Sequence, residues 1–269
     1  MKPVLSLFLR KELRDIRGNA QVWVGYLLLP LIGVGIPIVL LSLLPLDPAL
    51  PGIDPDFAAL FRFAALDPIL AGYPEGERVM RLLVREVGAF FLFMPVLLSS
   101  MGAAMSIAAE KQQRTLEPIL ATPVEDREFL LAKLLAAAVP GTLVTWGAGI
   151  LYALGTVVVS VVRLGYPVFP GLPFAVALLL LVPFAGGIAA LIGMRASMRA
   201  ADVQAAAQMA GLWVIPAALV LIGLLGRPAM RSVPLALLAL VLFGFLFWWL
   251  FVGTLKRFDR EEILVRWRR

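Results

Sequence analysis

The stretch that decides the fold is residues 87–133, which reads VGAFFLFMPVLLSSMGAAMSIAA and then EKQQRTLEPILATPVEDREFLLAK. The first part, residues 87–109, carries no charged side chain. It is long enough to cross a bilayer, because a spanning helix needs about 20 mostly apolar residues. The second part, residues 110–133, is rich in charge and is followed at once by another apolar stretch. The pattern predicts two membrane-spanning helices joined by a polar loop on one side of the membrane.

The whole chain has the composition of a protein that crosses the membrane several times. Of its 269 residues, 61% are hydrophobic and 16% are charged, against about 45–50% and about 25% in soluble domains. Apolar segments predict six spanning helices, at residues 21–44, 87–109, 135–162, 172–194, 203–225 and 234–255. We therefore expect an all-α polytopic membrane protein that forms a single transmembrane domain over residues 1–269.

The residue types that are missing exclude several kinds of chemistry. The chain has no cysteine and no histidine, which removes thiol catalysis, thiolate metal sites and the usual general base. All 18 acidic residues fall outside the predicted spans. Because carboxylates inside a membrane often form proton relays, their absence argues against a proton-coupled secondary transporter and against an intramembrane aspartyl protease. We predict no catalytic residue and no metal ligand.

The basic residues predict the orientation in the membrane. If the N-terminus is cytoplasmic, 17 of the 24 Lys and Arg residues lie on the inside, which fits the rule that cytoplasmic loops carry the positive charge. Both termini are then cytoplasmic in a multi-pass protein. The net charge of +6 is explained by this topology and does not indicate a nucleic-acid partner.

Several segments outside the spans have patterns of their own. Residues 1–20 predict an amphipathic helix at the cytoplasmic interface, either a simple anchor or a lever against a partner. Residues 45–86 form the long external segment, with short helices predicted to begin at Asp54-Pro55 and near Pro74-Glu75. This segment is either a passive connector or a gate. Residues 256–269 form a cytoplasmic tail.

The polar loop of residues 110–134 is patterned more strongly than a plain connection requires. An apolar group, Pro118-Ile119-Leu120, precedes Thr122-Pro123, which interrupts the helix. A second helix start follows, with Glu125, Asp126 and Glu128 in its first turn, where the helix dipole favours acidic side chains. Mixed charge around an apolar group suits docking onto a soluble protein.

This loop carries a family pattern. The order Glu110-x-x-x-Arg114-Thr115-Leu116-Glu117-x-x-Leu120-x-Thr122-Pro123-Val124, followed by Leu131-x-Lys133, resembles permeases of the ABC-transporter type-2 family. The resemblance implies six spans, an N-terminal interfacial helix and a cytoplasmic coupling helix between the second and third spans. It also implies that the residues that couple to an ATPase are Glu110, Arg114, Thr115, Leu116, Glu117, Ile119, Leu120 and Pro123.

The function that the resemblance implies is that of the permease subunit of an ABC exporter in a prokaryotic inner (cell) membrane. It would move a drug, lipid, peptide or ion out of the cytoplasm, with ATP and Mg bound by a separate ABC ATPase subunit. A second permease subunit, identical or a paralogue, would complete the dimer. The chain has no G-x-x-x-x-G-K-[ST] phosphate loop, so we expect no ATPase site and no bound cofactor in this chain.

The few polar residues inside the spans leave two interpretations open. Ser99, Ser100, Gln204 and Gln208 either line a translocation path between two protomers or form hydrogen bonds between helices. The alternative functions are a membrane anchor or assembly factor without transport and, less favoured, a secondary transporter. Because an apolar path accommodates lipids, drugs and peptides alike, the sequence does not distinguish these substrates.

The predicted topology can be tested by cysteine labelling, because the native chain has no cysteine. Ser232→Cys should react with a membrane-impermeant thiol reagent from outside intact cells. Gln113→Cys should react only after the membrane is permeabilised. The opposite labelling pattern would contradict the orientation inferred from the basic residues.

Overall fold

The computed structural model describes residues 10–11, 14, 18, 20–47, 55–113, 125–200, 202–256 and 258. Over these residues the structure is all-helical and has no strand. Six of the described helices are long and apolar enough to cross a membrane, which confirms the predicted fold class. Most of the predicted N-terminal helix and the predicted coupling helix lie outside the described residues.

The described elements follow one another as a series of helices. In chain order they are α2 (Ala20–Leu43), α3 (Pro55–Ala65), the 3₁₀ helix η1 (Pro68–Leu70), α4 (Glu75–Phe90), α5 (Phe93–Gln112), α7 (Asp126–Leu164), α8 (Leu172–Val176), the π-helical η2 (Ala177–Leu181), α9 (Val182–Arg199), α10 (Val203–Leu221), the π-helical η3 (Ile222–Gly226), α11 (Arg227–Ala229) and α12 (Val233–Lys256).

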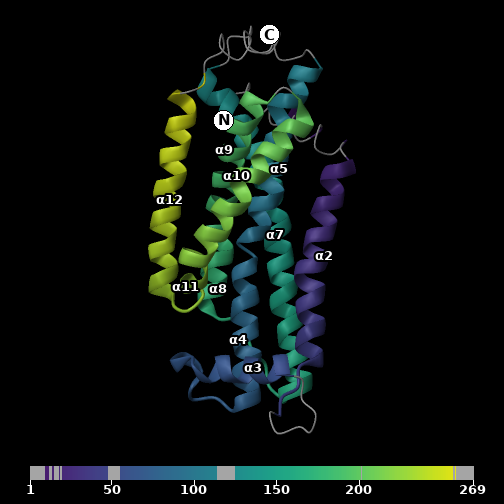
Figure 1. Ribbon diagram of the computed structural model, residues 1–269, viewed down its shortest axis with the longest axis vertical. Coiled ribbons are helices and arrows are strands. Elements are labelled where there is room, and N and C mark those ends of the chain that lie inside the picture. Colours follow the sequence, from purple (N-terminus) through teal and green to yellow (C-terminus); the bar gives the residue numbers. More distant parts are fainter. Residues whose placement is uncertain are drawn as a thin grey trace.

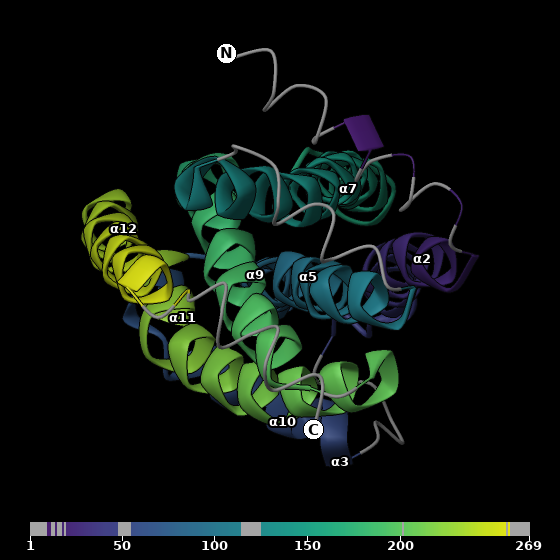
Figure 2. The ribbon, with the colours of Figure 1, turned by 90° about the horizontal axis from the view of Figure 1, so that it is seen from above.

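The long helices run side by side along the long axis of the molecule (Figure 1). The start of α2 and the end of α12 lie at one end, which we call the terminal end, whereas α3 lies across the other, the distal end. Figure 2 shows α5 and α9 in the middle of the bundle, with α7 on one side and α10 on the other. The positive-inside argument predicts that the terminal end is cytoplasmic.

Small residues let α5 and α9 pack closely at the centre. A Cβ atom placed on Gly193 of α9 would lie only 2.6 Å from the carbonyl oxygen of Ser100 in α5. Next to this contact, a cluster of alanines from α5, α9 and α10 is buried: Ala104, Ala108, Ala196, Ala200, Ala206 and Ala210. Helices in lipid associate through such close contacts, because lipid tails are as apolar as the side chains themselves.

The outer helices expose apolar faces. Large apolar side chains that are more than 60% exposed include Leu31 on α2, Trp213 on α10 and Trp248 on α12. Exposed apolar surface of this extent is expected where lipid tails or another membrane helix cover the protein. The six-helix bundle is therefore built for a membrane.

Prolines explain where the helices widen or break. Each π-helical segment ends two residues before a proline, η2 before Pro183 and η3 before Pro228. A proline has no N–H for the carbonyl four residues earlier, and its ring collides with that carbonyl, so the preceding turn widens. Pro95 likewise leaves the carbonyl of Phe91 without its helical hydrogen bond. Phe91 lies between the end of α4 and the start of α5, so this loss explains why the helix breaks there.

The predicted external segment shares a core with the spans. Helices α3 and α4 begin at Pro55 and Glu75, as the sequence predicts. Ala64 of α3 and Val79 of α4 are buried with Leu44, at the end of α2. The guanidinium of Arg163 at the end of α7 donates a hydrogen bond to the carbonyl of Leu44. The α3–α4 segment is therefore anchored to α2 and α7.

The close contact between α5 and α9 predicts a strong effect of one added methyl group. Gly193→Ala should destabilise the protein by about 1–3 kcal/mol, because the new Cβ meets backbone that cannot rotate away. The measurement is the thermal unfolding midpoint of the purified protein in detergent. Gly211→Ala on α10 is the matched control, since nothing lies within 4 Å of its Cβ position. Equal midpoints for the two variants would contradict this account of the packing.

Candidate functional site

The two ends of the predicted coupling loop are described, and its middle is not. The structure places Glu110 in the last turn of α5, and α7 begins at Asp126. Residues 114–124 lie outside the described residues. Arg114, Thr115, Leu116, Glu117, Ile119, Leu120 and Pro123 fall there, so their role in coupling stays a prediction.

A buried ion pair joins the two ends of this loop. The Nζ atom of Lys133 in α7 lies 2.9 Å from Oε2 of Glu110 in α5, and the two side chains are only 1% and 6% exposed. The ammonium of Lys133 also lies 5.2 Å from the ring centroid of Phe129, one turn earlier in α7. Removing one partner of such a pair leaves a buried charge. The loss of stability is therefore far larger than when one partner of a surface ion pair is removed.

The same carboxylate also binds the N-terminal segment. Lys11, one of the few described residues before α2, donates from its Nζ to Oε1 of Glu110. The side chain of Lys11 is 40% exposed. The Lys11–Glu110 contact is therefore open to water, whereas the Lys133–Glu110 contact is buried. Glu110 therefore holds three segments together, the end of α5, the start of α7 and the N-terminal segment.

Two further polar contacts connect helices toward the terminal end. The hydroxyl oxygen of Ser197 in α9 accepts a hydrogen bond of 2.9 Å from the backbone N–H of Ala108 in α5. The guanidinium of Arg195 in α9 donates to Thr254 Oγ1 at 2.9 Å and to the carbonyl of Leu250 at 2.7 Å, both in α12. Together with the Glu110 contacts, these bonds connect α5, α7, α9 and α12.

Glu110 is among the residues predicted from the sequence to couple to an ATPase, but its pairing with Lys133 was not predicted. Each of the two residues stands beside an apolar span, and their charges are opposite. These two facts could have suggested the pair, because a charged side chain at the end of a membrane span costs less free energy when an opposite charge is next to it. Hydropathy does not say which way each helix faces, so the contact itself required the structure.

The two candidate serines of the path lie among packed helices. Ser99 of α5 is fully buried, and Cβ atoms placed on Gly141 of α7 and Gly186 of α9 would lie 2.8 and 2.9 Å from its Oγ. This hydroxyl has no hydrogen-bond partner among the described residues. The Oγ of Ser100 donates to the carbonyl of Leu97 at 3.1 Å.

The two candidate glutamines lie on another side of the bundle. Gln204 and Gln208 are exposed on α10. Gln204 lines a groove of about 590 Å³, together with Met101 and Met105 of α5. Within this chain, the serines and the glutamines do not line one cavity. Ser99 lies on the side of α5 that faces α7 and α9. The groove that Gln204 lines is formed with Met101 and Met105, on the side of α5 that faces α10. A shared path stays a prediction.

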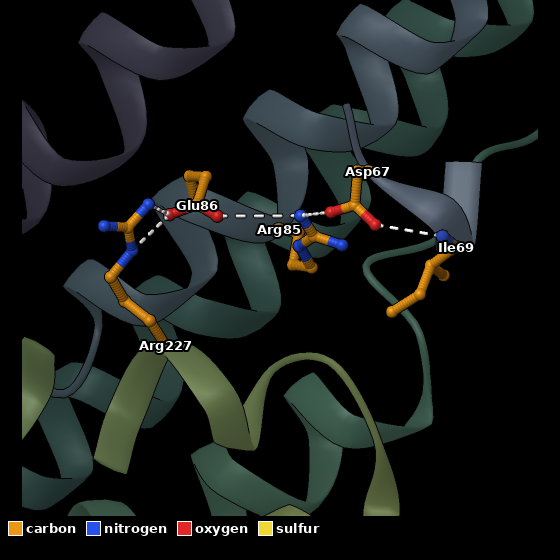
Figure 3. Close-up of polar contacts among 5 residues, drawn as sticks. All are labelled: Asp67, Ile69, Arg85, Glu86 and Arg227. Carbon is orange, nitrogen blue, oxygen red and sulfur yellow. Dashed lines mark hydrogen bonds and ion pairs between the residues drawn. The ribbon is translucent and has the colours of Figure 1, made fainter. Parts of the chain in front are cut away.

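A charged network that was not predicted from the sequence lies at the distal end (Figure 3). Arg85 of α4 pairs with Asp67, which precedes η1, and lies 3.7 Å from the neighbouring Glu86. Arg227 of α11 reaches Glu86 with two nitrogen atoms, each 2.7 Å from Oε2. The network thus connects the external segment, α4 and α11.

Electrostatics keep the Asp67 carboxyl ionised in this network. Burial alone would raise its pKa, but the hydrogen bonds from Arg85 and from the backbone N–H of Ile69 lower it. The nearby charges of Arg85 and Arg231 lower it further, so the pKa lies below the usual value. The carboxylate therefore stays paired with Arg85 at neutral pH.

Comparison with known proteins identifies the family. Neither the curated proteins nor the solved structures gave a match to this chain. Residues 7–234 match the family described as "ABC-2 family transporter protein". That range covers five of the six helices long enough to cross a membrane and the whole polar loop that the Glu110–Lys133 pair closes. The chain therefore belongs to the ABC-2 family of transporter proteins, as a membrane-spanning permease.

Proposed function

We propose that this permease is the membrane subunit of an ATP-driven exporter and couples to a separate ABC ATPase through residues 110–134. Family membership supports a transporter permease with an ATPase partner. The proposal adds the outward direction of transport and the site of contact. The observation that carries the proposed contact site is the buried ion pair between Glu110 and Lys133, which closes the base of this loop. The outward direction follows from the family resemblance of the loop.

The position of this pair supports a mechanical role for the loop. A flexible base would absorb a push on residues 114–124 before the push reached the membrane. Here the base is a contact between two side chains that are almost fully buried. Separating an ion pair in such a place has a high cost, because each charge would be left buried without its partner. A force on the loop would therefore reach α5 and α7 directly.

The location of the polar residues supports a path that two subunits complete. The groove beside Gln204 opens on the surface of the bundle and is lined in part by Met101 and Met105. We propose that a second permease subunit, identical or a paralogue, covers a face of this kind. ATP and Mg would be bound by the ATPase subunits, with both termini of the permease in the cytoplasm of a prokaryotic cell.

The first test concerns the predicted contact with the ATPase. Leu120→Asp should weaken binding of the cognate ATPase by more than about 1–2 kcal/mol, because it places a charge in the apolar centre of the contact. Glu117→Lys should lower transport-stimulated ATP hydrolysis, because it reverses a charge at the rim. The measurements are pull-down of the ATPase and ATP hydrolysis at matched membrane expression.

The control for these variants is Arg62→Glu, a charge reversal at an exposed position on α3 at the distal end. It should leave ATPase binding unchanged. If Leu120→Asp and Glu117→Lys both keep full binding and coupled hydrolysis, the loop is only a connector. The assignment of residues 110–134 as the contact with the ATPase would then be wrong.

The second test concerns the ion pair itself. Glu110→Gln removes the carboxylate from a lysine that is 1% exposed and should cost about 3–5 kcal/mol. The double variant Glu110→Gln/Lys133→Met should be more stable than Glu110→Gln alone, because no buried ammonium remains. The measurement is the thermal unfolding midpoint in detergent.

The matched control for the ion pair is Glu86→Gln at the distal end. Its partner Arg227 is 60% exposed, so this change should cost less than about 1 kcal/mol. Equal losses for Glu86→Gln and Glu110→Gln would show that burial does not set the strength of the Glu110–Lys133 contact.

A further inference from the structure

A cleft at the distal end combines apolar walls with a charged edge. It lies between α3, α4 and α11 and has a volume of about 610 Å³. Phe63, Leu66, Leu82 and Leu83 contribute apolar walls. The charged network of Figure 3 forms its edge, and Arg231 is added to that edge just before α12. Such a mixture suits a molecule with a charged group and an apolar part.

The edge carries an excess of positive charge. Arg85 is paired with Asp67, and Arg227 is paired with Glu86. Arg231 lines the same cleft and is exposed; its charge acts on the nearby Asp67, but among the described residues its side chain forms no hydrogen bond or ion pair. The guanidinium of Arg227 also remains accessible, since its side chain is 60% exposed. Arg231 is therefore available to an anion at the mouth of the cleft, and the exposed part of the Arg227 guanidinium lines the same cleft.

The cleft lies where the apolar surface of the bundle ends. Glu86 directly precedes the apolar residues 87–109, and Arg231 stands two residues before Val233, the first residue of α12. The mouth thus lies at the depth at which lipid head groups meet the acyl chains.

We propose that this cleft binds an anionic phospholipid from the leaflet at the distal end. The phosphate lies between Arg227 and Arg231, whose guanidinium groups match phosphate oxygens in charge and geometry. An acyl chain lies along Leu82 and Leu83 of α4 and Phe63 of α3. A zwitterionic lipid binds more weakly, because the positive group of its head group offsets the negative charge of its phosphate, which Arg231 attracts. This site is independent of the contact with the ATPase.

Lipid retention by the purified full-length protein tests the proposal. The protein is titrated with phosphatidylglycerol or phosphatidylcholine of the same acyl chains, and bound lipid is counted by native mass spectrometry. Arg231→Gln should lower phosphatidylglycerol binding about fivefold, which is the contribution of one basic residue near a lipid surface. Leu66→Glu, at a position 77% exposed, should lower it at least as much, because it adds a negative charge at the mouth.

The matched control is Arg62→Gln, which removes the same charge from an exposed position on α3 that does not line the cleft. It should bind phosphatidylglycerol like the native protein, and all variants should elute from gel filtration like the native protein. Full retention by both Arg231→Gln and Leu66→Glu would overturn the proposal. So would equal losses in all three variants, equal binding of phosphatidylcholine, or full competition by soluble glycerol phosphate.

Discussion

The rest of the structure depends on the close contact between α5 and α9. In a bilayer, apolar side chains gain little by leaving lipid for one another, so helices associate through shape and close packing. Gly193 meets the backbone of α5, and Gly186 meets Ser99 of the same helix. The neighbouring helices are added to this centre in the same way. Gly141 brings α7 against Ser99, and Ala206 and Ala210 bring α10 against the alanines of α5 and α9.

Charged residues are arranged around this apolar centre at its two ends, and their burial separates two kinds of site. The Glu110–Lys133 pair is almost completely buried. Separating such charges leaves one of them unsolvated, so the pair acts as a fixed joint. At the distal end Arg227 is 60% exposed, and water or another anion can replace its partner at little cost. Ion pairs thus serve two purposes in this protein. At the terminal end a buried pair fixes α5 against α7, and at the distal end exposed arginines stay accessible to an anion.

The spans themselves could be predicted from the sequence, because length and hydropathy decide whether a segment crosses a bilayer. The predicted sixth span, residues 234–255, differs from α12 (Val233–Lys256) by one residue at each end. The third differs more. It was predicted at residues 135–162, whereas α7 runs from Asp126 to Leu164. The polar helix start at Asp126 and the apolar span behind it are one helix, because no residue between them interrupts it.

The contacts between spans could not be predicted, and the reason is physical. A span that is apolar on every side has no face that marks its rotation about its own axis. Ser99 and Gln204 could therefore be placed at a depth in the membrane but not on a particular side of a helix. The partner of Glu110 was hidden for the same reason. Its contact with Lys133 depends on how α5 and α7 are turned, and the sequence pattern does not contain that information.

The long helices connect the two charged ends in different ways. Helix α7 runs without a break from Asp126, near the Glu110–Lys133 pair, to Leu164, beside Arg163 and its bond to Leu44. The chain of α4 and α5 also reaches from Arg85 at the distal network to Glu110, but it is broken between Phe90 and Phe93. A displacement at Lys133 would therefore be passed along one continuous helix, in which Pro140 removes a single backbone hydrogen bond. A displacement at Glu110 would instead meet the break between α5 and α4. Because the ion pair joins both helices at the terminal end, a common push there would reach the distal end through α7 first.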